Sequence, residues 1–293
     1  MENITIPGGI YLLSFAVLSD IHAQVDRLKI ALEDLKEINK DYTALILNGD
    51  LVDRGILQHY NRLSNLLKDT SLVPKIIIKN IGNHEYYKDY TRGPNEWNGN
   101  DVLLTRYLNF SQRNTVYDDL WINGYHFINL GSETTYNKCV DPSTDRANIS
   151  DKQISWLEGK ITENYLKGRP IFVFLHQPLD DTILFSRLHH FNINKDYEIK
   201  KIFCKYPEIV YFCSHSHHNF IENGNFYRDS SGFSVVDTSS IVKPSLFCKK
   251  EVPVDSIQGI YVEVYEKEVL IRSRDFLNKQ WIYSGEFTIH YGN

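Results

Sequence analysis

The chain has 293 residues, of which 42% are hydrophobic and 24% are charged, as is typical of a globular protein with one or two domains. Its net charge of −5 at pH 7 excludes an overall positive field that would bind nucleic acid without sequence specificity. The apolar run 10–18 is too short to cross a bilayer, and no basic segment precedes it as in a secretory signal peptide. The four cysteines form neither a CxxC pair nor a dense disulfide framework, so we expect reduced thiols, a cytoplasmic location and no membrane partner.

The first two thirds of the sequence predict buried strands that alternate with helices. Apolar runs without polar alternation are typical of strands covered on both faces, and five such runs occur at 15–18, 44–47, 76–78, 171–175 and 209–212. Apolar residues recur at helical spacing in the stretches 28–38, 60–67 and 154–165. This βαβ alternation predicts a largely parallel sheet.

One helix also has signals at both of its ends. Ser150 followed by Gln153 fits a capping box that opens a helix over 151–166, and Gly168 with Pro170 would close it.

The region 86–118 is polar and aromatic and shows little periodicity before Val102. We interpret 86–100 as a long surface loop directly after a candidate metal ligand. A loop of this length can be a lid that faces the substrate or an ordinary surface excursion, and the sequence leaves both open.

Beyond Gly232 the pattern changes to short strands over 235–238, 259–266 and 269–274, with a turn at Glu266 and Lys267. Tyr261 and Glu263 belong to an alternating pattern that is typical of antiparallel hairpins. We expect residues 1–293 to form a single domain, in which 233–293 are C-terminal β-hairpins that complete a second sheet.

Each of the five apolar runs leads directly into a metal-binding type of residue. The donors in chain order are Asp20, His22, Asp50, Asn83, His176, His215 and His217. If the runs are strands of one sheet, their ends would gather these donors around two metal ions. Carboxylate, imidazole and amide oxygen together suit manganese, iron and zinc.

Two segments make a chance arrangement hard to accept. Residues 49–55, Gly-Asp-Leu-Val-Asp-Arg-Gly, contain a five-position pattern that is expected in about 1 in 10,000 random sequences of this length. The segment 82–85, Gly-Asn-His-Glu, follows at the next strand end, although Gly-Asn-His alone would be a common turn.

The two histidines His215 and His217 lie two positions apart, which in an extended segment would direct both side chains to one face and His218 to the other. Neither this pair nor His176 would indicate a metal site in isolation, because most histidines are ordinary core or surface residues. The complete set of donors carries the prediction.

These motifs resemble the calcineurin-like metallophosphoesterase superfamily, whose pattern runs Asp-x-His, Gly-Asp-x-x-Asp, Gly-Asn-His, His and Gly-His-x-His. The motifs occur here in the same order between Asp20 and His217. One departure is Ser214, which replaces the glycine before His215; serine can follow that backbone if its φ is negative. The resemblance implies a mixed α/β fold, a four-layer αββα sandwich of two mixed β-sheets flanked by helices.

The resemblance also implies which residues bind metal. One ion would be held by Asp20, His22, Asp50 and His217, and the second by Asp50, Asn83, His176 and His215. Asp50 would bridge the two ions, which could be manganese, iron or zinc.

For catalysis, the resemblance implies that His84 is the general acid and that Asp53 orients it. Arg54 matches a family variant that grips phosphate oxygens, but a salt bridge to a helix over 56–68 is an equal alternative. The expected mechanism is in-line attack on phosphorus by a metal-bridging hydroxide, while His84 protonates the leaving group.

The resemblance implies that the substrate is a small phosphate ester, with nucleotides among the candidates. The His-x-His ending and the segment 153–157 favour the cyclic-nucleotide phosphodiesterase and purple acid phosphatase branch, whereas the segment 53–55 favours the protein phosphatases. We therefore expect a phosphodiesterase, with a phosphomonoesterase as the alternative and a non-catalytic metal-binding scaffold as the alternative from another class. The pair His189 and His190 could face the cleft from a loop.

Overall fold

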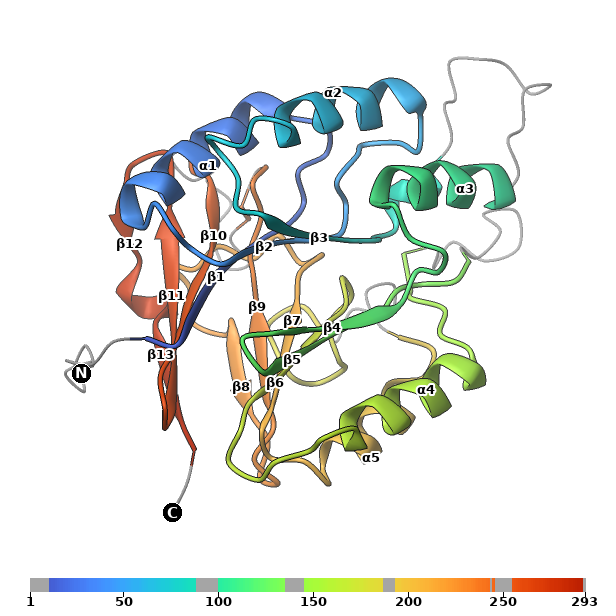
Figure 1. The fold of residues 1–293 in the computed structure, drawn as a ribbon, viewed down its shortest axis with the longest axis vertical. Coiled ribbons are helices and arrows are strands. Elements are labelled where there is room, and N and C mark those ends of the chain that lie inside the picture. Colours follow the sequence, from blue (N-terminus) through green and yellow to red (C-terminus); the bar gives the residue numbers. More distant parts are fainter. Residues whose placement is uncertain are drawn as a thin grey trace.

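The computed structural model describes residues 11–87, 100–134, 145–186, 193–242, 244–245 and 255–291. In this part of the chain two mixed β-sheets stack face to face, with α1 and α2 above the first sheet and α4 and α5 below the second (Figure 1). The predicted four-layer αββα sandwich is confirmed.

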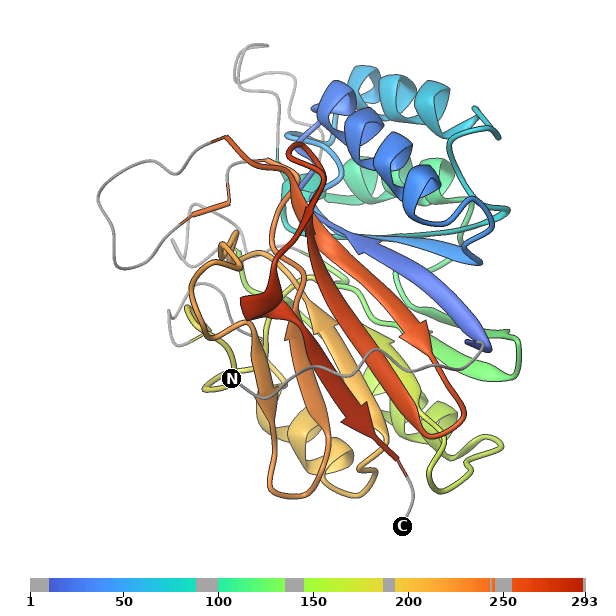
Figure 2. The same ribbon diagram turned by 90° about the vertical axis from the view of Figure 1, so that its left-hand side faces the viewer.

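The first sheet has the strand order β12-β11-β10-β1-β2-β3, and β13 also pairs with β11. Its N-terminal strands run parallel: β1 (Leu13–Leu18), β2 (Ala44–Asn48) and β3 (Ile76–Asn80). The connecting helices are α1 (Val25–Ile38) and α2 (Leu57–Leu67). The C-terminal strands join the free edge of β1 in antiparallel pairs: β10 (Gln258–Val264), β11 (Glu268–Asp275), β12 (Gln280–Trp281) and β13 (Phe287–His290). Figure 2 shows β10 and β11 beside β1.

The second sheet has the strand order β4-β5-β6-β7-β9-β8. Its strands are β4 (Asp118–Ile122), β5 (Tyr125–Asn129), β6 (Ile171–Phe174), β7 (Ile209–Cys213), β8 (Phe226–Arg228) and β9 (Ser234–Asp237). The strands β5, β6, β7 and β9 are parallel, and the two edge strands are antiparallel. The remaining helices are α3 (Asn100–Ser111), α4 (Asp151–Thr162) and α5 (Asp196–Phe203), with single 3-10 turns η1 (His84–Tyr86) and η3 (Tyr283–Gly285).

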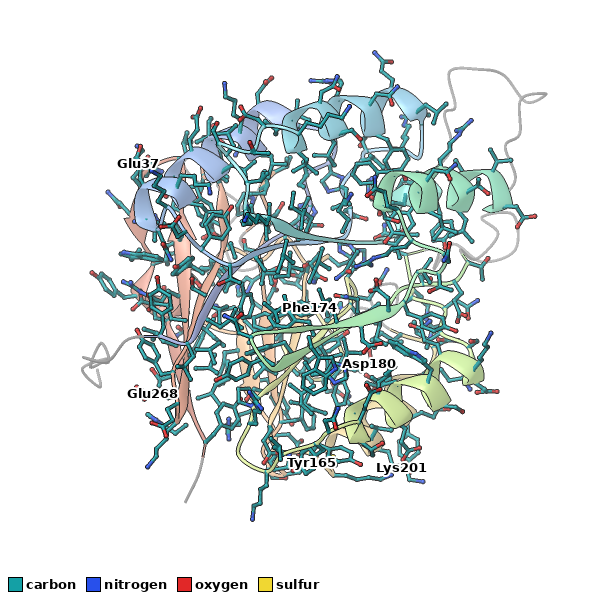
Figure 3. All side chains as sticks on the ribbon, viewed as in Figure 1. Glu37, Tyr165, Phe174, Asp180, Lys201 and Glu268 are labelled. Atoms are coloured by element: carbon teal, nitrogen blue, oxygen red, sulfur yellow. The ribbon has the colours of Figure 1, made fainter. Side chains whose placement is uncertain are left out.

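Three apolar cores separate the four layers, and β1 shows why its sequence lacks polar alternation. Phe15 and Val17 lie in the core between the sheets, whereas Ala16 and Leu18 lie in the core beneath α1 and α2. Phe15 packs edge-on against Phe172 with ring centroids 5.0 Å apart. Each such buried side chain contributes about 1.5–3 kcal/mol. Figure 3 shows Phe174 in this interior, whereas Glu37 and Glu268 lie at the periphery.

The strands that lead into the candidate ligands do not form one sheet. β1, β2 and β3 belong to the first sheet, and β6 and β7 belong to the second. The region 233–293 is likewise divided, because β9 joins the second sheet and β10 to β13 extend the first. An apolar run that is buried on both faces has the same sequence pattern in either sheet. Hydrophobic periodicity therefore could not assign each strand to the first or the second sheet.

The predicted cap of α4 is confirmed, because Ser150 Oγ accepts a hydrogen bond from the Gln153 backbone N–H at 3.2 Å. The Gln153 side chain does not return to Ser150; it is fully buried and pairs with both backbone groups of Gly131, at 3.1 and 3.0 Å. The helix ends at Thr162, before the predicted residue 166, because Glu163 is extended and Asn164 has φ 53°.

Two further expectations fall on parts of the chain outside the described residues. These are most of the predicted loop 86–100, of which residues 88–99 are not described, and the pair His189 and His190. None of the helices in the described ranges is long and apolar enough to span a membrane.

Candidate metal centre

The carboxyl ends of strands from both sheets meet at one edge of the sandwich, and the chain turns sharply just after each of them. Five of the seven candidate ligands have left-handed backbones, with positive φ at Asp20 (53°), His22 (46°), Asp50 (51°), His215 (69°) and His217 (51°). Such conformations cost free energy for residues other than glycine and gather at functional sites. The prediction of an extended segment from His215 to His217 is therefore wrong, and the two rings reach the site from a bend.

The first candidate group consists of Asp20, His22 and His217, whose donor atoms all lie within 4.8 Å of one another. His217 Nε2 is 3.0 Å from Asp20 Oδ1 and 3.2 Å from His22 Nε2. His22 Nε2 is also 4.0 Å from Asp50 Oδ2. These four side chains are close enough to share one cation.

The second candidate group consists of Asp50, His176 and His215, which are all buried and also lie within 4.8 Å of one another. His176 Nε2 is 3.2 Å from Asp50 Oδ2. His176 Nδ1 lies 2.9 Å from the backbone oxygen of Asn48, which fixes this nitrogen as the donor and leaves Nε2 facing the site. Asp50 thus lies between the two groups, as a bridging ligand must.

Asn83 lines the same pocket as Asp50 and His215. Its Nδ2 donates to the Tyr87 hydroxyl oxygen at 3.1 Å and to Asp145 Oδ1 at 3.3 Å. Its Oδ1 is buried and accepts no hydrogen bond from any residue in the described ranges. A buried oxygen without a donor is expected where a cation belongs, so the residues present fit a bound metal.

Burial favours neutral imidazole at two of the histidines. Burial lowers the pKa of His22 to about 4 and that of His215 to about 3, although the nearby carboxylates oppose this. Burial acts in the same sense on His176, but Asp50 and Asp20 outweigh it and raise its pKa to about 10. In turn, His217 and His176 overcome the burial of Asp20 and lower its pKa to about 2. A cation at the second group would therefore displace the proton of His176.

Glu85 holds two of the ligand-bearing turns together. Its fully buried carboxylate accepts hydrogen bonds from the backbone N–H groups of Asp50 (3.2 Å), Leu51 (2.8 Å) and Gly82 (2.6 Å). Burial and the nearby charge of Asp50 raise its pKa to about 7. Sequence reasoning gave this residue no role, although an acidic residue directly after His84 at a buried strand end was a usable signal.

The glycines of the motifs are required by the space around them. Gly49 has φ +93°, and a Cβ there would lie 2.6 Å from His176 Nδ1. A Cβ at Gly82 would lie 2.2 Å from Asp50 Oδ1. Any larger residue at either position would displace a candidate ligand.

A buried polar link joins the two sheets directly beneath the site. Asn48 Nδ2 donates to Ser214 Oγ at 3.1 Å and to the Leu175 backbone oxygen at 3.2 Å, and Ser214 Oγ lies 2.6 Å from Thr238 Oγ1. Ser214 is not among the described residues with positive φ, so the serine follows the backbone as expected. Asn48 and Thr238 were not recognised in the sequence, where each looks like an ordinary strand residue.

His84 lies beside both candidate groups, with Nε2 3.8 Å from Asp50 Oδ2. Its Nδ1 is 2.9 Å from the backbone oxygen of Asp53, and the Asp53 carboxylate is farther away, at 3.9 Å. The side chain of Arg54 lies next to Asp53, with Nε 3.7 Å from Asp53 Oδ2. Arg54 does not line the pocket over the two candidate groups.

A pocket of about 410 Å³ opens over these groups. It is lined by His22, Gln24, Asp50, Asp53, Asn83, His84, Tyr87, Asp145, His215, His217 and Val242. The pocket therefore exposes ligands of both candidate groups, His84 and two further carboxylates to the same space.

The sequence profile of the calcineurin-like phosphoesterases matches residues 13–219, which span all seven candidate ligands and His84. The chain belongs to this family, whose members hold two metal ions, and it is a metal-dependent hydrolase of phosphate esters. No curated protein matches the sequence.

Solved structures share the fold at low sequence identity. A dimetal phosphatase from Danio rerio is 14% identical with a TM-score of 0.68, over 97% of this chain and 100% of that one. A purple acid phosphatase from yellow lupin (Lupinus luteus) seeds is 14% identical with a TM-score of 0.64, over 97% of this chain and 55% of that one. GAP50, the anchor in the inner membrane complex of Plasmodium, is 12% identical with a TM-score of 0.61, over 96% of this chain and 89% of that one.

Proposed function

We propose that the chain hydrolyses phosphodiesters. The observation that carries this proposal is the charge on the pocket wall, where Asp53 and Asp145 face the same space as the candidate metal groups. Within the described residues, the lining includes neither lysine nor arginine.

The charge balance favours a singly charged substrate. The charge of two divalent ions would be largely offset by the carboxylates of Asp20, Asp50 and Asp145, and in smaller part by Asp53, which is ion-paired with Arg54. A phosphomonoester dianion would meet this wall with two negative charges, whereas a phosphodiester carries one and has a second ester group that can occupy the pocket. Small diesters, nucleotides among them, fit the volume of the pocket.

We propose the metal ligands on the basis of the two groups and their distances. Asp20, His22, Asp50 and His217 would hold one cation, and Asp50, Asn83, His176 and His215 the other. Bound cations would supply Lewis-acid polarisation of the phosphoryl group and lower the pKa of water at the site. The donor set suits manganese, iron and zinc.

We propose His84 as the general acid. Because its Nδ1 faces the backbone oxygen of Asp53, Nε2 is the nitrogen that points into the pocket. A proton on Nε2 can be donated to the leaving-group oxygen while the Asp53 carbonyl stabilises the ring in that orientation. For Arg54 we propose a supporting role, in which its ion pair with Asp53 steadies the rim of the pocket.

We also propose that residues 1–293 act as one domain, because β10 pairs directly with β1 and both strands supply the core between the sheets. A reducing, cytoplasmic environment agrees with the free thiols of Cys204 and Cys213.

The runner-up is a phosphomonoesterase. A test compares bis(p-nitrophenyl) phosphate with p-nitrophenyl phosphate, each with manganese, zinc and iron. We expect kcat/KM for the diester to exceed that for the monoester by about tenfold or more with the preferred metal, because one fewer negative charge faces the two wall carboxylates. Faster hydrolysis of the monoester with every metal would contradict the diesterase proposal and favour the runner-up.

A further inference from the structure

We infer that Tyr87 and Asp145 are positioning residues that fix the amide of Asn83 with its oxygen toward the second cation. This inference rests on the proposed ligand set and adds two residues to it. Neither residue belongs to a motif that the sequence analysis used.

The three side chains form a closed triangle of hydrogen bonds. Asn83 Nδ2 has two hydrogens, of which one goes to the Tyr87 hydroxyl oxygen and the other to Asp145 Oδ1. The Tyr87 hydroxyl donates its own hydrogen to the same Asp145 oxygen. Every donor in the triangle therefore has an acceptor, and all three hydrogens are assigned.

The carboxylate of Asp145 determines which way the amide lies. An ionised carboxylate only accepts hydrogen bonds, so it attracts the amide nitrogen and repels the amide oxygen. If the Asn83 amide were flipped, its oxygen would face Asp145 Oδ1 and the Tyr87 oxygen, and its nitrogen would face the metal groups. The triangle excludes this arrangement and keeps Oδ1, the atom that can bind a cation, turned away from Asp145 and without a donor among the described residues.

Asp145 is itself attached to the second candidate group. Its backbone oxygen accepts a hydrogen bond from Gln177 Nε2 at 2.9 Å, and Gln177 is fully buried next to His176. The backbone oxygen of Gln177 is held in turn by the Tyr211 hydroxyl at 2.6 Å. The triangle thus joins Asn83, which follows β3 of the first sheet, to the turn after β6 of the second sheet that carries His176.

The contact between Tyr87 and His84 requires a variant that separates two effects. The two rings lie 4.1 Å apart between centroids, so removing the whole Tyr87 side chain would also disturb His84. Tyr87→Phe keeps the ring and removes only the hydroxyl. Asp145→Asn keeps the shape of the side chain and replaces an acceptor by a group that can pair with either orientation of the Asn83 amide.

Tyr86→Phe is the matched control. Tyr86 is the neighbouring residue, it is buried, and its hydroxyl donates to the backbone oxygen of Ser132 at 2.7 Å without touching Asn83. It therefore reports the cost of losing a buried tyrosine hydroxyl beside the site but outside the triangle.

The experiment titrates metal-free full-length protein with Mn²⁺ and with Zn²⁺ by calorimetry, and counts the bound metal after dialysis. We expect wild type and Tyr86→Phe to bind two cations. In Tyr87→Phe and Asp145→Asn, one cation should keep its affinity and the other should bind about 10- to 100-fold more weakly. The metal concentration for half-maximal hydrolysis should rise by the same factor.

Two results would overturn the inference while the ligand set stands. One is wild-type affinity for both cations in Tyr87→Phe and Asp145→Asn. The other is an equal loss of affinity for both cations together with a lower unfolding temperature of the metal-free variants. That result would indicate a structural role. A wild-type protein that binds fewer than two cations would contradict the ligand set, and the inference with it.

Discussion

The backbone oxygen of Asp53, rather than its carboxylate, is the group that lies in hydrogen-bonding range of His84: the oxygen is 2.9 Å from Nδ1 and the carboxylate is 3.9 Å away. The side chain of Asp53 is exposed. The sequence motif predicts that the Asp53 side chain orients the histidine. We propose that the main-chain oxygen contributes to this orientation, and every residue at position 53 retains that oxygen.

The first prediction concerns these two residues. His84→Ala should lower kcat by on the order of 10²-fold or more, because the leaving group loses its proton donor. Asp53→Asn should lower kcat by less than about tenfold, since the backbone oxygen still holds the ring. Steady-state kinetics at saturating metal, together with a metal count, measures both. A loss in Asp53→Asn as large as that in His84→Ala would show that the carboxylate orients the ring, and unchanged turnover in His84→Ala would reject its role as acid.

The second prediction concerns the proposed bridge. Asp50 Oδ2 lies 3.2 Å from His176 Nε2 and 4.0 Å from His22 Nε2, so Asp50→Asn removes a charged oxygen from both proposed ligand sets. The variant should hold fewer metal ions than wild type after dialysis, by elemental analysis of folded protein. A full complement of two ions would rule out the bridging assignment.

The convergence of the donors could be predicted from the sequence because their positions depend on strand ends. Asp20, Asp50 and Asn83 each follow an apolar run, and parallel strands of one sheet end at the same edge. The approach of His176 and His217 from the second sheet could not be derived from periodicity, since Ile171–Phe174 is as uniformly buried as Ala44–Asn48. Only the resemblance to a family implied two stacked sheets.

Residues that act through long-range contacts could not be predicted, because no local sequence pattern marks them. Asp145 is 62 positions from Asn83, and no motif surrounds it. Likewise, nothing in His215-Ser216-His217 signals a positive φ at both histidines, because the bend is imposed by buried contacts such as that between Ser216 and Asp237. Such positions are visible only once the chain is folded.

The third prediction concerns the stability of the turns that carry Asp50 and Gly82. Glu85→Gln replaces one acceptor oxygen by an N–H group that faces backbone donors, so a buried donor loses its partner. The free energy of unfolding of the metal-free protein should fall by about 1–3 kcal/mol. Urea unfolding measures this, with the surface variant Glu198→Gln as control. Equal stability of Glu85→Gln and wild type would mean that these hydrogen bonds do not hold the turns.

The fourth prediction concerns pH and a residue far from the metal groups. His126 on β5 is buried, its Nε2 lies 2.9 Å from Asp119 Oδ2, and its ring stacks on Trp121. Burial lowers the pKa of His126 below 6.5, although Asp119 opposes this. A second proton would place an N–H at Nδ1, which has no hydrogen-bond partner in the described part of the chain.

The sign of the effect follows from this lowered pKa. Below pH 6.5 the unfolded chain takes up a proton at His126 that the folded protein resists, so stability is lost as the pH falls toward the folded-state pKa. His126→Gln removes this group, and the decrease in unfolding free energy between pH 7.5 and pH 5.5 should become smaller than in wild type by up to about 1.4 kcal/mol. Urea unfolding of both proteins at the two pH values measures the difference. An equal decrease in both proteins would show that His126 titrates alike in the folded and unfolded states, contrary to its burial beside Trp121.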